Sequence, residues 1–240
     1  MRIIVTLLYF LLAMLYSYPK RLMNHIRYKN KKDEHDANFY SLQKIIRKML
    51  KILGVKIEVQ GCTMYDEPVV YIGNHRSNFD SLIMIAIMER PFIFIGKSEI
   101  KKFPFIGKWF VDVGCLFLER GDIKKSIEVI NKGIERLENG YSIVIFPEGG
   151  RTKEEKVRDF KPGSFKLVAK TAARIVPVTF YNSEACYERE HKLRSANVSI
   201  NLGEIIDYRE LEFNNTVQAA KYLQTVIAHT YEAQRCCDKI

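Results

Sequence analysis

A histidine and an aspartate stand five residues apart in the stretch VVYIGNHRSNFDS, from Val69 to Ser81. A neutral imidazole at His75 can take a proton from an alcohol as the alcohol attacks a carbonyl. A carboxylate at Asp80 can hold the other ring nitrogen and stabilise the imidazolium. Ser77 and Asp80 also match a helix capping box, which would use the same carboxylate at a helix start. We expect the orientation of His75 to prevail, and the pair then predicts general-base chemistry.

Three other predicted strands also end in polar residues. In open α/β sheets, ligands gather where strands end and loops begin, so these side chains can converge on one anionic substrate. Each cluster has a simpler interpretation as well: a surface ion pair contributes under about 1 kcal/mol, and proline with glycine forms ordinary turns. The clusters are Lys97 and Glu99, then Glu119 to Asp122, and then Pro147 to Thr152.

The chain offers no protein nucleophile beside the His–Asp pair. No serine stands in a G-x-S-x-G context, and no cysteine is near His75 in the sequence. The attacking hydroxyl would then belong to a substrate, and we expect no covalent enzyme intermediate. The cysteines follow no metal-ligand spacing, so we expect reduced thiols and no metal site. They are Cys62, Cys115, Cys186, Cys236 and Cys237.

From Val55 onward, apolar runs alternate with amphipathic segments. Continuous apolar strands between helices indicate an α/β sheet covered on both faces. Predicted strands are Lys56–Gln60, Val69–Gly73, Phe92–Ile95, Cys115–Leu118, Ser142–Phe146, Ile175–Phe180 and Val198–Leu202. Predicted helices are Ser81–Met88, Lys124–Leu137, Phe165–Ala173 and Thr216–Ala233.

The first residues favour a membrane. The net charge of +10 indicates anionic partners, which include phospholipid headgroups, nucleic acid and phosphorylated substrates. No charge occurs between Arg2 and Lys20, and no small-residue cleavage site follows this apolar run. The run is slightly short for a full span of roughly 20 residues. We therefore favour an anchor or a shallowly embedded helix over a full span, followed by a basic connector from Lys20 to Asp36.

A second apolar periodicity follows in ANFYSLQKIIRKMLKILG, with lysines and an arginine on the opposite side and Gly54 as a C-cap. Two interpretations stay open. This helix either forms a basic platform on a membrane surface, or packs on the domain with a solvated basic face. Either way we predict an N-terminal membrane-anchoring helical motif over residues 1–54 and one α/β domain over residues 55–240.

With these motifs in place, the sequence resembles the glycerolipid acyltransferases, whose best-known members are the 1-acyl-glycerol-3-phosphate acyltransferases. NHRSNFD is similar to the N-H-x-S-x-x-D block of that family. Three more blocks follow in the same order between about Tyr71 and Phe180: GKSEIKKFPFIG with FLERGD, FPEGGRT, and IVPVTF. The resemblance implies a glycerol-3-phosphate acyltransferase-like fold, which is a single mixed sheet covered by helices.

By position, the resemblance assigns roles to seven residues. His75 would be the general base, and Asp80 would be its orienting partner. The acceptor phosphate would be bound by Lys97, Arg120 and Arg151. The site would be shaped by Glu148 and Gly149. Two residues depart from the family's pattern: Gly150 replaces the usual Thr, and Glu119 replaces the usual Asp. These changes affect the acceptor assignment more than the reaction type.

The leading interpretation is an enzyme that moves a fatty acyl group from acyl-CoA or acyl-carrier protein to lysophosphatidic acid. It would need no cofactor, and it would work at a membrane surface with the active site facing the cytoplasm. A sister interpretation changes the acceptor to glycerol-3-phosphate or another lysophospholipid. The non-enzyme alternatives are an inactive lipid-binding scaffold and a basic nucleic-acid-binding module. The intact His75 and Asp80 disfavour the first, and the missing RNA-stacking or zinc-finger motif disfavours the second.

Overall fold

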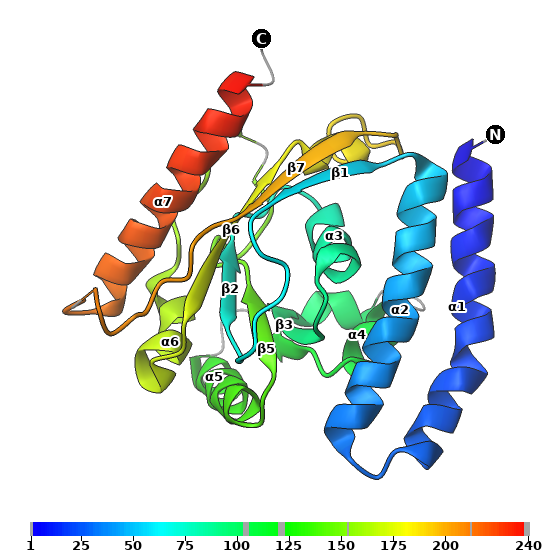
Figure 1. Ribbon diagram of the computed structural model, residues 1–240, viewed down its shortest axis with the longest axis horizontal. Coiled ribbons are helices and arrows are strands. Elements are labelled where there is room, and N and C mark those ends of the chain that lie inside the picture. The colour runs from blue at the N-terminus through cyan, green and yellow to red at the C-terminus, as the bar shows by residue number, and fades with distance from the viewer. Residues whose placement is uncertain (1, 103–105, 120–122, 153, 212, 238–240) are drawn as a thin grey trace.

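The computed structural model describes residues 2–102, 106–119, 123–152, 154–211 and 213–237. Within them one sheet crosses the molecule with the strand order β1-β7-β6-β2-β5-β3-β4 (Figure 1). Neighbouring strands are parallel, except that β6 and β7 are antiparallel. The strands are β1 Lys56–Gln60, β2 Val70–Gly73, β3 Phe92–Lys97, β4 Leu116–Leu118, β5 Ser142–Ile145, β6 Ile175–Tyr181 and β7 Asn197–Leu202. The predicted single mixed sheet is confirmed.

Helices cover both faces of this sheet. Side chains alternate along β2, so Tyr71 joins the core under α2, α3 and α4, while Val70 and Ile72 join the core under α5, α6 and α7. The helices are α1 Arg2–Arg27, α2 Lys31–Leu53, α3 Phe79–Ile87, α4 Ile106–Asp112, α5 Ile123–Glu138, α6 Lys166–Thr171 and α7 Thr216–Cys237. Short 3₁₀ helices are η1 Ser98–Lys102, η2 Pro162–Phe165 and η3 Ser183–Cys186.

The sheet topology brings the predicted polar clusters together. Strands β6, β2, β5 and β3 are consecutive neighbours and mutually parallel, so their carboxyl ends lie at one edge. His75 follows β2, Glu148 follows β5, and Lys97 ends β3. This arrangement is why clusters far apart in the sequence can form one site.

The predicted connector from Lys20 to Asp36 is wrong, because most of it is helical. Helix α1 runs through Pro19 to Arg27, and α2 begins at Lys31. Proline removes a single intrahelical N–H bond, and tertiary contacts hold the rest of the helix. The Asn24 amide donates to Asn38 Oδ1 of α2 at 2.9 Å, and Arg21 pairs with Asp112 of α4. The side chain of Asn30 caps α2.

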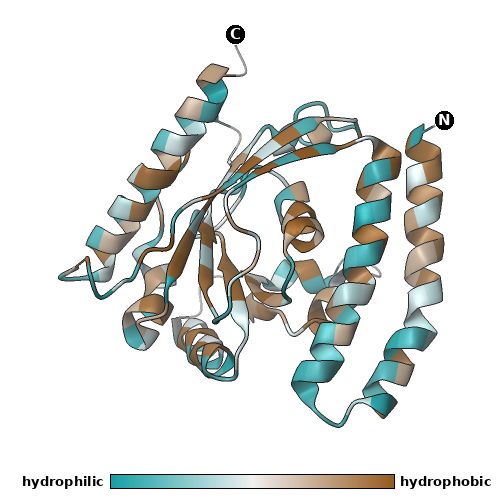
Figure 2. Ribbon diagram, viewed as in Figure 1, coloured by the Kyte–Doolittle hydropathy of each residue, from teal (hydrophilic) through white to brown (hydrophobic). Residues whose placement is uncertain are grey.

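Helix α1 is turned with its polar side toward the protein. Its buried residues are Thr6, Met14, Ser17, Arg21 and Asn24. A surface helix of a soluble domain normally buries its apolar stripe instead. Among the described residues, α1 is the helix long and apolar enough to cross a membrane by length and composition, and little of it is buried. Its outward side is brown to pale in Figure 2 and includes Ile3, Ile4, Val5, Leu7, Leu8, Leu11, Leu12, Leu15, Leu22, Met23 and Ile26.

Helix α2 decides between the two interpretations of the second periodicity. Phe39, Leu42 and Ile46 are buried in the core that α2 shares with α3 and the sheet. Gln43 caps the carboxyl end of α3 by donating to the carbonyls of Ile85 and Met88, both at 2.7 Å. Gly54 ends α2 with φ +84°, as expected for a C-cap. The apolar face of α2 therefore packs on the domain and leaves a basic face exposed.

Candidate active site

His75 and Asp80 meet at the end of β2. The loop from Asn74 to Asn78 turns the chain into α3, and His75 Nδ1 lies 2.8 Å from Asp80 Oδ2. Asp80 is fully buried, whereas His75 keeps 18% of its side chain exposed. A carboxylate can only accept, so Nδ1 carries the proton. The other ring nitrogen, Nε2, is then the one that can take a proton from a substrate.

The two roles weighed for Asp80 do not compete. Its Oδ2 accepts the ring proton of His75 and also the backbone N–H groups of Arg76 at 2.7 Å and Ser77 at 2.8 Å. Ser77 Oγ in turn accepts from Phe79 N–H, the first residue of α3. One carboxylate oxygen thus supports the helix start and orients the histidine, because it accepts from the ring and from two backbone N–H groups.

A second serine completes the coordination of Asp80, and sequence reasoning missed it. Ser183 in η3 is fully buried, and its Oγ donates to Asp80 Oδ1 at 2.5 Å. Since Ser183 follows β6, it reaches the same edge of the sheet as His75. Both oxygens of the buried carboxylate therefore accept at least one hydrogen bond.

The remaining polar residues of the loop also have fixed partners. The Asn74 amide donates to the carbonyl of Phe180 at 2.9 Å and accepts from its N–H at 2.8 Å, which ties the loop to β6. The buried guanidinium of Arg76 forms an ion pair with Glu184 at 2.9 Å. The concentration of polar side chains after β2 thus forms a rigid support for His75.

The third block of the family pattern, Phe146 to Thr152, contacts both the backbone and the ring of His75. Glu148 Oε1 accepts from the N–H of His75 at 2.9 Å, and the N–H of Thr152 donates to the His75 carbonyl at 3.0 Å. The imidazole stacks on Phe146 with ring centroids 4.4 Å apart. Gly149 has φ +66°, and a Cβ there would lie 2.5 Å from Lys161 Nζ, so this turn requires glycine.

Glu148 carries an unusual carboxyl group. Burial raises its pKa to about 7, and within the described residues its Oε2 has no hydrogen-bond partner. Because the pKa in the folded state exceeds the ordinary value of 4.5, the protonated form favours folding. That contribution is complete below about pH 4.5 and is lost as the pH rises to about 7.

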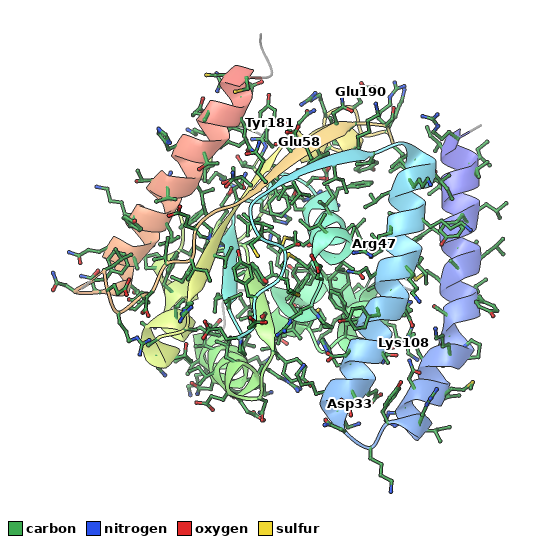
Figure 3. All side chains as sticks on the ribbon, in the orientation of Figure 1. Asp33, Arg47, Glu58, Lys108, Tyr181 and Glu190 are labelled. Carbon is green, nitrogen blue, oxygen red and sulfur yellow. The ribbon has the colours of Figure 1, made fainter. Side chains whose placement is uncertain are left out.

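The variant Glu148→Gln cannot ionise but keeps the acceptor for His75. As the pH rises from 4.5 to 7.5, the wild type should lose up to about 3 kcal/mol of its free energy of unfolding through Glu148. The variant should not show this loss. Urea denaturation across this pH range measures the difference. Glu58→Gln, which changes an exposed carboxylate on β1 (Figure 3), is the control. Parallel stability curves for Glu148→Gln and the wild type would show that Glu148 titrates normally.

The predicted cationic residues are only partly placed. A Cβ on Gly150 would lie 3.1 Å from Lys97 Nζ, so Lys97 reaches the third block. Arg120 lies outside the described residues. Its neighbour Glu119 pairs with Lys125 at 2.5 Å.

Arg151 forms an ion pair with the segment that follows η3. It pairs with Glu188 at 2.8 Å and not with Glu148, since Glu148 is buried beneath the loop. Glu188 also accepts from Ser77 Oγ at 2.5 Å and from Asn78 N–H at 2.9 Å. Glu188 thus links Arg151 to the loop that carries His75.

A groove of about 940 Å³ adjoins the third block. Phe146 and Gly149 form its end nearest His75, and Lys97 and Lys161 lie on its wall. Apolar side chains line the rest, including Ile95, Leu118, Ile130 and Ile145. A groove with both apolar and cationic walls suits a ligand that carries a hydrocarbon chain and a negative charge.

Comparison with known proteins places the fold and these blocks in context. A family model described as acyltransferase matches residues 56–181, more than half of the chain. The 1-acyl-sn-glycerol-3-phosphate acyltransferase of Borreliella burgdorferi is 32% identical over 177 residues, which cover 72% of this chain and 71% of that protein. A chloroplastic 1-acyl-sn-glycerol-3-phosphate acyltransferase of Arabidopsis thaliana is 34% identical over 127 residues, 52% of this chain but 35% of that protein.

A solved structure matches almost the whole chain. The crystal structure of the 1-acyl-sn-glycerophosphate acyltransferase PlsC from Thermotoga maritima has a TM-score of 0.77 and covers 98% of each chain. The two sequences are 21% identical. This likeness shows a shared fold that includes the two N-terminal helices.

Proposed function

The chain belongs to the acyltransferase family, and from this premise we propose that it transfers a fatty acyl group from an acyl thioester to the free hydroxyl of 1-acyl-glycerol-3-phosphate, giving phosphatidic acid. The relatives in Borreliella burgdorferi and Arabidopsis thaliana, both 1-acyl-sn-glycerol-3-phosphate acyltransferases, support this acceptor. The observation that carries the proposal is the buried Asp80 carboxylate that holds His75 at the end of β2. A base oriented in this way suits the deprotonation of an alcohol.

The proposed reaction has two proton transfers. His75 Nε2 takes the proton of the acceptor hydroxyl as its oxygen attacks the thioester carbonyl, and a tetrahedral intermediate forms. The imidazolium is stabilised by Asp80. When the carbon–sulfur bond breaks, the imidazolium returns the proton to the leaving thiolate, and the products are an ester and a free thiol. The donor is acyl-CoA or acyl-carrier protein, since both present the same thioester.

We propose that no metal and no acyl-enzyme take part. His75 itself supplies the base, and the buried cysteines are poor nucleophiles because burial raises the pKa of both Cys115 and Cys186 to about 12. The acceptor phosphate would be bound by Lys97, Arg151 and Arg120. Arginine suits this task because its planar fork binds two phosphate oxygens at once.

The test is acyl transfer by the purified protein in detergent, with a labelled acyl thioester and a panel of acceptors. We expect lysophosphatidic acid to be the best acceptor, ahead of glycerol-3-phosphate and lysophosphatidylcholine, and a chelator to leave the rate unchanged. Transfer to glycerol-3-phosphate or to a phosphocholine lipid in preference to lysophosphatidic acid would overturn the assignment of the acceptor.

Ser183 should contribute to catalysis through Asp80. Ser183→Ala removes a hydrogen bond to a buried charged group, so the rate should fall roughly tenfold. The loss should appear in kcat and leave both KM values nearly unchanged, because Ser183 contacts Asp80 and acts through it. Ser183→Thr keeps the hydroxyl and should restore most of the rate. Ser142→Ala removes a hydroxyl that accepts from Val69 N–H at the start of β2, and it is the control. If Ser183→Ala lost stability as Ser142→Ala does and kept the wild-type kcat, the role of Ser183 would be structural.

We further propose that α1 associates with a membrane and that the active site faces the cytoplasm. The support is the outward apolar side of α1, which has no covering protein surface within the described residues. The triple variant Leu8→Gln, Leu12→Gln and Leu15→Gln changes three half-exposed side chains on this side.

Burial of one leucine contributes about 2 kcal/mol, so the triple variant should bind vesicles at least about a hundredfold more weakly. Vesicle sedimentation measures this. Val217→Gln on α7, which changes an exposed apolar residue away from α1, should leave binding intact. Equal vesicle binding by the triple variant and the wild type would remove α1 as the membrane contact.

A further inference from the structure

The amino end of α1 lies beside the carboxyl end of α2, close to the start of β1 (Figure 1). A second pocket, of about 480 Å³, is lined by residues from these three segments. Ala86 and Ile87 line it from the carboxyl end of α3, whereas Asp80 lies at the opposite end of that helix. At a rise of 1.5 Å per residue, this separates the pocket from the catalytic pair by roughly 9 Å along α3. His75 and Asp80 do not line it.

The walls of this pocket carry positive charge without a matching negative charge. Arg2, Arg47, Lys51 and Lys56 line it, and no aspartate or glutamate does. In the described part of the chain, none of these four residues forms an ion pair. Four cations around one cavity produce a positive potential that attracts an anion. Val55 and Ile57 provide apolar surface beside them.

A hydrogen bond fixes the guanidinium of Arg47, and a glycine makes room for that of Arg2. Arg47 Nε donates to the carbonyl of Ala86 at 2.6 Å, and Figure 3 shows Arg47 between α2 and α3. Arg47 lines the pocket, and its planar guanidinium offers the fork geometry that phosphate oxygens match. Gly54 has φ +84°, and a Cβ there would lie 2.8 Å from Arg2 Nη1. The missing side chain at Gly54 therefore makes room for Arg2 over the end of α2.

The position of the pocket identifies the kind of anion. Arg2 begins α1, and the next exposed residues on that helix are Ile3, Ile4, Val5, Leu7 and Leu8. A ligand with a phosphate in the pocket and hydrocarbon chains beside it would contact both surfaces. Anionic membrane lipids carry both groups, and basic residues next to an apolar helix favour them. A free phosphate would use the cations alone.

We propose that this pocket binds the phosphate headgroup of an anionic phospholipid in the membrane that α1 contacts. The lipid would hold the amino end of α1 at the membrane surface and would not be a substrate of the His75 site. This inference rests on the proposed membrane association of α1 and does not depend on the acyl-transfer reaction.

The test compares two double variants of the full-length protein on vesicles of phosphatidylcholine with and without phosphatidylglycerol. Lys51→Gln/Lys56→Gln removes two charges from the pocket, and Lys20→Gln/Lys44→Gln removes two exposed charges from α1 and α2 outside it. If the protein bound anionic lipid through a diffuse basic surface, both double variants would lose about the same affinity for vesicles. Each lysine would then contribute equally to binding. We expect Lys51→Gln/Lys56→Gln to lower the affinity for vesicles roughly tenfold more than Lys20→Gln/Lys44→Gln does. This difference should occur only on vesicles that contain phosphatidylglycerol.

Three results would overturn the inference. They are equal losses for the two pairs, no preference of the wild type for phosphatidylglycerol, and saturable binding of inorganic phosphate in detergent that Lys51→Gln/Lys56→Gln abolishes. The last result would mean that the pocket takes free phosphate. Acyl transfer in detergent micelles separates this question from the proposed function, because Lys51→Gln/Lys56→Gln should transfer at the wild-type rate. If even the wild type transferred no acyl group, the proposed function would fail while the vesicle comparison kept its meaning.

Discussion

Replacing His75 with alanine is expected to lower the rate of acyl transfer by about two to four orders of magnitude, because a positioned general base typically contributes that much. The backbone contacts of residue 75 with Glu148 and Thr152 do not involve the imidazole, so the fold should persist. Melting temperature and vesicle binding of His75→Ala should stay close to those of the wild type. His229→Ala, at an exposed position of α7, is the matched control and should keep its activity.

Asp80→Asn should lose most of the activity for a related reason. The amide nitrogen of asparagine is a donor, and three donors surround Oδ2 while Ser183 donates to Oδ1. If the amide nitrogen takes the place of Oδ2, three donors lose their acceptor, and if it takes the place of Oδ1, Ser183 loses its acceptor. In both orientations the imidazolium loses its counter-charge. A variant His75→Ala or Asp80→Asn with more than about a tenth of the wild-type rate would contradict the general-base role.

Arg151→Ala is expected to raise the KM for lysophosphatidic acid by roughly 10- to 100-fold, since a charge-assisted hydrogen bond contributes about 1.5–3 kcal/mol. The KM for the acyl thioester should change much less. Arg151→Lys should recover only part of the loss, because the charge returns without the planar fork. Steady-state kinetics with each substrate varied in turn gives both constants.

The structural alternative is that Arg151 acts only through Glu188. Under this alternative, Glu188→Gln should have the same kinetic constants as Arg151→Ala, because Glu188 also contacts Ser77 and Asn78 in the loop that carries His75. Arg194→Ala breaks the exposed ion pair with Glu190 and controls for the loss of a surface pair. A lowered melting temperature for Arg151→Ala with an unchanged acceptor KM would reject the phosphate assignment.

The sheet and the His75–Asp80 contact could be predicted because their signals are local. Strands buried on both faces, such as β2 and most of β3, are continuous apolar runs. All seven strands lie within a few residues of their predicted bounds. The contact between His75 and Asp80 joins residues on one loop and the helix start that follows it. Local spacing therefore sufficed for both.

The rest depended on contacts that no local pattern reveals. Ser183 and Glu188 reach the loop from more than a hundred residues away, and neither belongs to a recognisable motif. Helix α4 is short and was not predicted. The helical continuation of α1 past Pro19 follows from its packing on α2 through Asn24 and Asn38, which outweighs the local signal of the proline.

The most direct test of direct transfer assisted by His75 is a single-turnover experiment with the enzyme in excess over a labelled acyl thioester and with saturating lysophosphatidic acid. Quenching at successive times follows the label on thioester, protein and lipid. We predict that label passes from the thioester to phosphatidic acid without appearing on the protein, and that His75→Ala leaves it on the thioester. Label trapped on a serine or cysteine, or an undiminished transfer rate in His75→Ala, would contradict the mechanism.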